Sequence, residues 1–555
     1  MSNTLRYTLL FTCAGMLFFI PFLGGVHLFD WDEINFAEIS REMIVTEDYF
    51  RVYINFKPFW EKPPFFFWLQ AGAMSAFGVG EFAARFPNAV CGIFTLVLLF
   101  RIGQKLYDTQ FGIIWAGAYF GSVLPFLYFK SGIIDPWFNL FIFLGLYYFI
   151  LFYWKKETFQ NISLTRNKWH YLLWGGFILG LAIITKGPVA YLIAVLTMGV
   201  YWLFKKFRLY ITPGQLVLFS ISALLITFAW FGIEYLKNGP WFITEFTRYQ
   251  YRLFSTPDAG HAGFPGYHFV VLFFGVFPAS VFAIRSFFKM PEEKHIYQQD
   301  FKRWMSILFW VVLILFTIVK SKIVHYSSLC YFPMTFLAAL VIYKIIKKEI
   351  AFRPVLKTGL WITGGVFVLA SLALPVAGKN IDLIRPLFKK DPFAVANLEA
   401  GIYWSYVDMI PGIFLLLLLG TVLYFFRHQK FRRGFICLFA GVPVYILLGL
   451  IFFINNIEGY SQRAAIEFFK ARAGEDCYVV TEGYKSYAQL FYFRKPPVTN
   501  QKEYDKNWLY TGDIDKPVYV VTKVNKLNKL ELYPELKKIG EKNGFVFLKR
   551  DVKKE

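Results

Sequence analysis

Long apolar segments separated by short charged connections dominate the first 455 residues of the chain. A helix of roughly 18 to 22 apolar residues spans the ~30 Å hydrocarbon core of a bilayer. We therefore predict a polytopic α-helical membrane protein with about thirteen transmembrane helices. They are expected near residues 8–28, 83–103, 111–129, 137–154, 170–186, 187–204, 215–236, 268–288, 305–320, 327–346, 357–376, 407–426 and 434–455.

The connections between these spans differ in charge and length. Basic residues gather at alternate short connections, including KKETFQNISLTRNK, KKFR and RHQKFRR, and the positive-inside rule makes such loops cytoplasmic. The N-terminus is then cytoplasmic and the C-terminal tail lies outside. Three long connections, 29–82, 237–267 and 377–406, lie outside as well.

The first outside connection begins with the acidic stretch FDWDEINFAEISREM. Residues 33–46 place Phe36, Ile39 and Met43 on one stripe and two glutamates on another, which predicts an amphipathic helix along the membrane surface. A second helix suited to the interface is expected after the double proline of EKPPFFFW.

Residues 456–555 have the composition of a soluble domain and are predicted to fold apart from the membrane domain 1–455. SQRAAIEFFKARA and KSYAQLFYF favour helices, and CYVVTEGY favours a strand. VYVVTKV and FVFLKR are expected to be strands flanking a Lys/Leu-rich helix. This small α/β domain has no glycine-rich nucleotide fingerprint and no phosphate loop, so no chemistry is expected of it.

Composition supports membrane residence, because the chain is 57% hydrophobic and only 17% charged, against about 25% charged residues in soluble domains. The net charge of +22 does not predict nucleic-acid binding, since much of it lies in the cytoplasmic loops. Four of the five cysteines lie in or near spans and only Cys477 lies in the tail, which excludes a disulfide framework there. The first span lacks a cleavage site and is expected to be a retained anchor.

Ionisable residues fall near the outside ends of the predicted spans rather than at their centres, where ion-coupled transporters need them. Lys186 in ITKGP is one example, and it either extends to the interface or contacts an anion. Asp32 and Asp135 each stand at an outside helix start, Asp135 directly before Pro136. Each acid either caps its helix or acts as a base or orienting group, and together they favour a reaction at the outer boundary.

Cationic and metal-ligating residues occur in two outside connections. Lys62 in WEKPPFFFW either anchors the segment at the surface or holds a lipid phosphate as a point charge. Arg248 and Arg252 would share a helical face that is either solvated or phosphate-binding. Glu61 and His261 provide only two metal ligands, below the usual three or four of a zinc site.

The motifs D-E-x-x-F-A-E-I-x-R-E-M, E-K-P-P, I-I-D-P, T-K-G-P and S-K-x-x-x-Y occur in the order found in the aminoarabinose transferase family. The chain resembles that family over about residues 8–455, most specifically in the first half. The family consists of polytopic GT-C glycosyltransferases related to protein O-mannosyltransferases. The resemblance implies transfer of a sugar from a polyprenyl-phosphate carrier on the outer face of the bacterial inner membrane, with the α/β tail in the periplasm.

The resemblance also implies roles for individual residues. Asp32 would be the catalytic carboxylate, and Asp135 the second acid near the donor sugar or the acceptor. Lys62 would hold the donor phosphate with help from Arg252. Tyr326 matches the family tyrosine after the S-K motif, on a loop over the donor.

Glu61 and His261 would match a family metal pair, with zinc as the possible ion. Two positions depart from the family pattern. Asn35 stands where the family often has arginine, and KIVHY replaces K-L-P-x-Y without the proline. These changes bear on the identity of the sugar and the acceptor more than on the reaction type.

The leading hypothesis is a transferase, with single displacement at the anomeric centre, acting on lipid A or another envelope glycolipid. A protein O-glycosyltransferase with the same donor type is the alternative within the enzyme class. A lipid or oligosaccharide flippase is the alternative from another class. Membrane lipids are expected partners, nucleic acid is not, and a monomer is expected.

Overall fold

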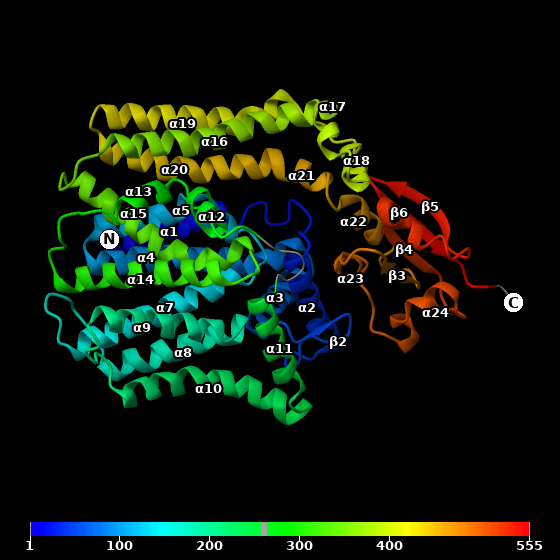
Figure 1. Ribbon diagram of the computed structural model, residues 1–555, viewed down its shortest axis with the longest axis horizontal. Coiled ribbons are helices and arrows are strands. Elements are labelled where there is room, and N and C mark those ends of the chain that lie inside the picture. Colours follow the sequence, from blue (N-terminus) through cyan, green and yellow to red (C-terminus); the bar gives the residue numbers. More distant parts are fainter. Residues whose placement is uncertain (1, 257–262, 554–555) are drawn as a thin grey trace.

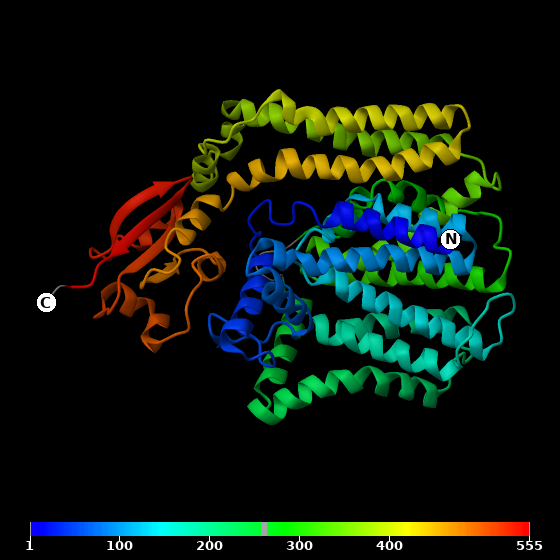
Figure 2. The same ribbon diagram turned by 180° about the vertical axis from the view of Figure 1, so that it is seen from behind.

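The computed structural model describes residues 2–256 and 263–553. A bundle of long helices forms the larger part, and a small sheet domain lies at one end of it (Figures 1 and 2). The bundle helices are α1 (Asn3–Phe19), α4 (Glu81–Leu106), α5 (Thr109–Phe120), α6 (Val123–Tyr128), α7 (Asp135–Lys156), α8 (Lys168–Lys186), α9 (Val189–Phe204), α10 (Pro213–Asn238), α12 (Tyr267–Gly275), α13 (Ala279–Arg285), α14 (Ile296–Ile318), α15 (Tyr331–Ile346), α16 (Pro354–Lys379), α19 (Ile410–Arg427) and α20 (Phe431–Gly449).

Every predicted span contains one of these helices, but the predicted number of thirteen is not confirmed. Among the described residues, eight helices are long and apolar enough to cross a membrane, or nine if α12 and α13, bent by 115°, form one span. The predicted span 268–288 is thus divided between α12 and α13, and the predicted span 111–129 is divided between α5 and α6 at Gly121. A Cβ on Gly121 would lie 2.5 Å from the Phe439 carbonyl oxygen, so this break accompanies a close approach to α20. An apolar run in the sequence does not reveal such a break.

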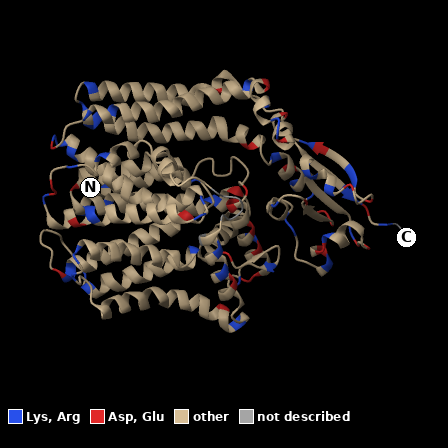
Figure 3. Ribbon diagram, viewed as in Figure 1, with Lys and Arg blue, Asp and Glu red and all other residues tan. Residues whose placement is uncertain are grey.

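Lysine and arginine gather at the end of the bundle that is remote from the sheet domain (Figure 3). This end carries the short basic connections. The opposite end carries α2 (Asp32–Thr46), the strands β1 (Tyr53–Ile54) and β2 (Lys57–Pro58), α3 (Phe65–Phe77) and α11 (Trp241–Ser255). These elements lie between the bundle and the sheet domain, as Figure 1 shows.

Both helices expected in the first outside connection form, as α2 and α3. The polar stripe of α2, however, does not face water, because Glu38 and Glu42 are fully buried. Glu38 accepts two hydrogen bonds of 2.7 Å from Arg41, and Arg41 also donates to the Lys495 carbonyl oxygen. The C-terminal domain therefore covers the face that the sequence pattern assigns to solvent.

The connection before α19 contains α17 (Ile381–Ile384), η3 (Arg385–Phe388), α18 (Pro392–Leu398) and η4 (Tyr406–Met409). After α20, a π-helical turn (Leu450–Ile454) and α21 (Asn455–Gly459) continue the last bundle helix to Gly459. The domain boundary expected at residue 456 falls inside this continuous helix and stays a prediction.

The C-terminal domain has a four-stranded sheet in the order β3-β4-β6-β5, in which β3 and β4 are parallel and the other pairs antiparallel. Its elements are α22 (Arg463–Lys470), β3 (Tyr478–Thr481), α23 (Ala488–Phe491), η6 (Gln501–Tyr504), α24 (Lys506–Thr511), β4 (Val518–Lys523), η7 (Val524–Lys529), β5 (Lys537–Lys542) and β6 (Phe545–Arg550).

The Lys/Leu-rich helix expected between the last two strands is wrong. Only the short 3-10 helix η7 forms there, and the chain continues into strand β5. Lys542 pairs with Phe545 across Asn543 and Gly544, which both have positive φ. Asn-Gly between two strands is the strongest short-range signal of a hairpin. The sequence therefore contained a signal for the β5–β6 hairpin, but the Lys/Leu-rich composition before it favoured a helix.

Glu33 joins the first outside connection to the bundle. Its carboxylate accepts hydrogen bonds of 3.0 and 2.8 Å from Arg85 on α4. It also accepts from the backbone N–H of Phe29 (2.9 Å) and of Gly132 (2.5 Å). Burial opposes its ionisation, but the Arg85 charge and these hydrogen bonds outweigh that effect and hold the pKa of Glu33 below its usual value.

Glu33→Gln is expected to destabilise the fold strongly, because it leaves the Arg85 guanidinium buried without its anion. Removing one partner of a buried ion pair costs about 3–5 kcal/mol. A thermal unfolding curve of the purified full chain in detergent tests this, with Glu47→Gln at the exposed end of α2 as the control. An unfolding midpoint equal to that of the control variant would contradict the structural role of Glu33.

Candidate active site

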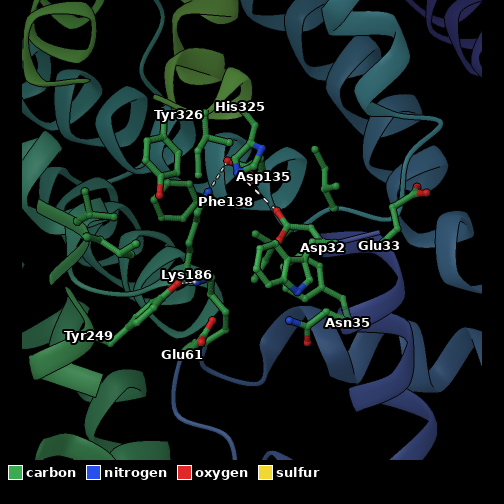
Figure 4. Close-up of a pocket in the computed structure, with 18 of the residues that line it drawn as sticks. Asp32, Glu33, Asn35, Glu61, Asp135, Phe138, Lys186, Tyr249, His325 and Tyr326 are labelled. Carbon is green, nitrogen blue, oxygen red and sulfur yellow. Dashed lines mark hydrogen bonds and ion pairs between the residues drawn. The ribbon is translucent and has the colours of Figure 1, made fainter. Parts of the chain in front are cut away.

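A cavity of about 610 Å³ lies at the end of the bundle that faces the C-terminal domain, and this size suits a small ligand. It is lined by residues from α2, α7, α8, α9, α11, α14 and η2 (Val324–Cys330), and by several connecting segments (Figure 4). The described site residues predicted from the sequence all line it: Asp32, Glu61, Lys62, Asp135, Arg252 and Tyr326.

Neither Asp32 nor Asp135 caps its helix. The N-cap positions of α2 and α7 are Trp31 and Ile134, and neither cap makes a side-chain hydrogen bond. Both acids instead occupy the first helical position, where the helix dipole favours an anion. The helix-cap interpretation is therefore wrong for both residues, and their carboxylates face the cavity.

Asp135 forms an ion pair with Lys186, whose Nζ lies 2.6 Å from Asp135 Oδ1. The Asp135 side chain is 3% exposed, so the pair is shielded from solvent. Lys186 is the last residue of α8, and Gly187, with φ of 118°, ends that helix. The T-K-G-P motif thus places a cation at the C-terminal end of α8, where a positive charge is favourable.

His325 lies between the two acids, and no motif had indicated it. Its Nε2 is 3.6 Å from Asp32 Oδ2 and 4.0 Å from Asp135 Oδ2 (Figure 4). Asp135 Oδ2 is buried, and no described residue donates a hydrogen bond to it. His325 stands within KIVHY, so the only available signal was a titratable residue inside the segment that departs from the family pattern.

Lys62 and Arg252 meet at the ring of Tyr249 on α11. Lys62 Nζ donates to the Tyr249 hydroxyl at 3.4 Å and lies 4.8 Å from its ring centroid. The Arg252 guanidinium lies 5.2 Å from the same centroid. Arg248 points elsewhere, because its exposed side chain pairs with Glu245. Two cations therefore converge on one part of the cavity, as phosphate binding requires.

The S-K motif has a structural role at its lysine. Lys322 Nζ donates to the carbonyl oxygens of Phe316 (3.0 Å), Thr317 (2.7 Å) and Val319 (2.5 Å) at the end of α14. It caps that helix and fixes the turn into η2. Tyr326 therefore belongs to a short 3-10 helix in the cavity wall, and its ring lies 5.4 Å from Lys186 Nζ.

Glu61 lines the cavity beside Lys62, but its expected metal partner His261 lies outside the described residues. Within residues 2–256 and 263–553, no group of three or more histidine, cysteine, aspartate or glutamate side chains is arranged to hold a metal ion. The zinc pair stays a prediction.

The C-terminal domain also contributes to the cavity wall, through Lys485 and Tyr487 between β3 and α23. Beside them, burial raises the pKa of Asp30 to about 6, although hydrogen bonds from Ser486 and the Tyr487 backbone counteract this effect. The sequence assigned this domain no chemistry because it lacks a nucleotide motif, and the structure adds that the domain forms part of the cavity wall.

Comparisons with known proteins find relatives of this chain by sequence and by fold. A family model for dolichyl-phosphate-mannose-protein mannosyltransferase matches residues 61–232. An undecaprenyl phosphate-alpha-4-amino-4-deoxy-L-arabinose arabinosyl transferase of Photorhabdus laumondii is 27% identical over 57% of this chain and 56% of its own length. The protein of the same name from Pectobacterium atrosepticum is 25% identical over 84% of this chain and 85% of its own.

The crystal structure of ArnT from Cupriavidus metallidurans bound to undecaprenyl phosphate aligns with a TM-score of 0.76 and 17% identity. The alignment covers 99% of this chain and 98% of that one. The same protein in the apo state aligns with a TM-score of 0.74. The chain therefore shares the fold of the Cupriavidus metallidurans ArnT. The resemblance of the sequence to the aminoarabinose transferases is confirmed.

Lys186→Met is expected to destabilise the protein, since it leaves the Asp135 carboxylate buried without a cation, at a cost of about 3–5 kcal/mol. Adding Asp135→Asn should recover part of that loss, because neighbouring partners are not additive. Thermal unfolding of both single variants and the double variant completes the cycle. Strict additivity of the two effects would argue against a coupled pair.

Proposed function

We propose that this protein is an integral membrane glycosyltransferase that moves a sugar from a polyprenyl-phosphate donor to lipid A or another envelope glycolipid. The observation that carries the proposal is the cavity itself. It combines two carboxylates at helix starts with two cations gathered at Tyr249. The names of the curated relatives supply undecaprenyl phosphate as the carrier and 4-amino-4-deoxy-L-arabinose as the sugar.

Lys62 and Arg252 bind the donor phosphate in this proposal, with Tyr326 nearby. The bond between the anomeric carbon and the phosphate oxygen breaks, and its electron pair leaves with the polyprenyl phosphate. Two cations stabilise the negative charge that develops on this leaving group, which is the largest electrostatic requirement of the step. The convergence of both cations on one tyrosine ring supports this assignment.

The acceptor oxygen attacks the anomeric carbon from the side opposite to the leaving phosphate, which inverts the configuration. An acceptor phosphate monoester is already a nucleophile and needs no strong base. An acceptor hydroxyl would give its proton to Asp32, whose side chain is 42% exposed to the cavity and suited to general-base work. Asp135, neutralised by Lys186, orients the sugar or the acceptor.

His325 holds the two acids in their relative positions. Its Nε2 lies within ion-pair distance of both carboxylates. As a neutral imidazole the ring can donate from Nε2 to only one of these oxygens at a time. The active arrangement of Asp32 therefore depends on the presence of this ring.

The proposed location is the bacterial inner membrane, with the cavity and the C-terminal domain on the periplasmic side. The separation of the basic loops from the C-terminal domain, at opposite ends of the bundle, supports this orientation. Membrane lipids surround the bundle. The monomeric state and the zinc pair at Glu61 and His261 stay predictions.

A protein acceptor is the second candidate, favoured by one observation. The matching family model is named for a protein mannosyltransferase, although it covers only residues 61–232. Mass spectrometry of envelope lipids and glycoproteins from cells with and without the protein distinguishes the two acceptors. A changed distribution of lipids across the membrane with no change in glycosylation would instead support a flippase.

Asp32→Asn is expected to lower the rate of sugar transfer by about 100-fold or more, the usual contribution of a positioned acid or base. Its unfolding midpoint should stay close to wild type, since Asp32 makes no helix-cap hydrogen bond. The measurement is transfer from undecaprenyl-phosphate sugar to lipid A by the reconstituted full chain. Asp382→Asn, in the exposed helix α17, is the control. Wild-type rates in Asp32→Asn would refute the catalytic assignment.

His325→Gln is expected to reduce kcat by up to about 100-fold through misplacement of the acids. The KM for the polyprenyl-phosphate donor should change little, because Lys62 and Arg252 bind that phosphate. The dependence of kcat on pH should also flatten, since glutamine does not titrate. His428→Gln, exposed after α19, is the control. A loss confined to the donor KM would count against the positioning role.

A further inference from the structure

Lys485 extends from the C-terminal domain to the cavity and lies next to Trp31, the residue before Asp32. Its Nζ is 4.5 Å from the Trp31 ring centroid and 5.5 Å from that of Tyr487. Two aromatic rings thus hold the charged end of this side chain at the Asp32 side of the cavity. A cation over such rings is held without losing its charge.

Lys485 differs from Lys186 and Lys62 because it makes no direct hydrogen bond or ion pair with a described residue, although its charge acts on the nearby Asp30 carboxylate. Lys186 is paired with Asp135, and Lys62 donates to Tyr249. Among the described residues, no carboxylate forms an ion pair with Lys485 and no side chain accepts a hydrogen bond from it. No described residue occupies the ammonium N–H donors of Lys485, so they can hydrogen-bond to a ligand in competition with the charge of Asp30.

The turn that carries Lys485 is firmly docked. The Tyr492 hydroxyl accepts from the Leu28 backbone N–H at 2.7 Å, and Gln462 donates to the Leu28 carbonyl oxygen at 2.5 Å. Arg494 donates to the Val79 carbonyl oxygen at 2.8 Å on the membrane-domain side. Because both ends of the segment are tied to the membrane domain, Lys485 is held at the cavity.

The cavity thus has cations at two separate places, a pair at one and a single lysine at the other. Lys62 and Arg252 meet at Tyr249, and Lys485 lies at Trp31 beside Asp32. Figure 4 shows Tyr249 and Asp32 at different sides of the cavity. In a single displacement the nucleophile and the leaving phosphate lie on opposite sides of the anomeric carbon. Two anionic substrates therefore need two separate cations.

We propose that Lys485, supported by Trp31 and Tyr487, forms an anion subsite for a phosphate group of the acceptor lipid beside Asp32. This inference rests on the proposed function and adds the C-terminal domain to substrate recognition. Lysine is a point charge on a flexible stem, which suits a phosphate group of variable orientation. The subsite also sets the acceptor apart from the polyprenyl phosphate, which Lys62 and Arg252 bind.

The test measures binding of diphosphorylated and of fully dephosphorylated lipid A to the detergent-solubilised full chain. Wild type is expected to prefer the phosphorylated form. Lys485→Ala should weaken that form by about tenfold, the size of one hydrogen bond to a charged group, and leave the dephosphorylated form unchanged. Lys485→Arg should restore most of the loss. Lys470→Ala, an exposed lysine of the same domain on α22, is the control.

A crossed comparison with Lys62→Ala separates the two phosphate sites. Lys62→Ala should weaken undecaprenyl phosphate binding and leave lipid A binding intact, and Lys485→Ala should do the reverse. Equal affinity of Lys485→Ala and wild type for phosphorylated lipid A would overturn the subsite. The subsite would also be overturned if Lys485→Ala lost as much affinity for phosphatidylglycerol vesicles as for phosphorylated lipid A. Lys485 would then contact the headgroups of bulk lipid.

The same measurements keep this inference apart from the proposed function. Absence of sugar transfer by the wild-type protein would refute the transferase, whereas the binding titrations need no turnover. Where transfer is observed, Lys485→Ala should raise the KM for the acceptor about tenfold and leave the KM for the donor and kcat within twofold. A change in the donor KM alone would overturn the assignment to the acceptor.

Discussion

The buried carboxylate of Glu33 is the interaction on which the arrangement of the site depends. It binds Arg85 of α4 and accepts from the backbone at Gly132, three residues before Asp135. Asp32 is its neighbour in the chain. One residue therefore fixes the starts of α2 and α7 relative to each other and to the bundle. Arg85 extends this control by donating to the Leu23 carbonyl oxygen, at the exit of the first helix.

The buried Glu33 carboxylate makes the structural hydrogen bonds at the start of α2, so the adjacent Asp32 carboxylate remains directed at the cavity. In many helices an aspartate at the first turn is used to satisfy backbone N–H groups. Here Glu33 binds the Phe29 and Gly132 amides, and Asp32 faces the cavity. The same division occurs at the S-K motif, where Lys322 caps α14 and the following helix presents His325 and Tyr326. Each motif thus combines a structural residue with a neighbour that lines the cavity.

Much of this could be predicted from the sequence, because apolar runs and motif order are local signals. The bundle helices, the helix at residues 33–46 and the described acids and cations of the cavity all follow from such signals. The burial of Glu38 and Glu42 does not, because it results from docking of residues more than 400 positions away. His325 escaped for a similar reason. His325 is of interest because its side chain lies near Asp32 and Asp135, and the spacing of these residues in the sequence does not reveal that proximity.

The positions that depart from the family pattern are expected to bear on the identity of the sugar and the acceptor more than on the reaction type. Asn35 lines the cavity, whereas Val324, which stands where the family has proline, is not among the lining residues. The described charged residues expected to bind the donor phosphate also line the cavity. Asn35 is 6% exposed, and no described residue donates to its side-chain oxygen. A buried acceptor without a donor costs about 1–3 kcal/mol. A substrate hydroxyl or amino group that supplies the donor would recover this cost, so we expect Asn35 to favour substrates that can donate a hydrogen bond at this point.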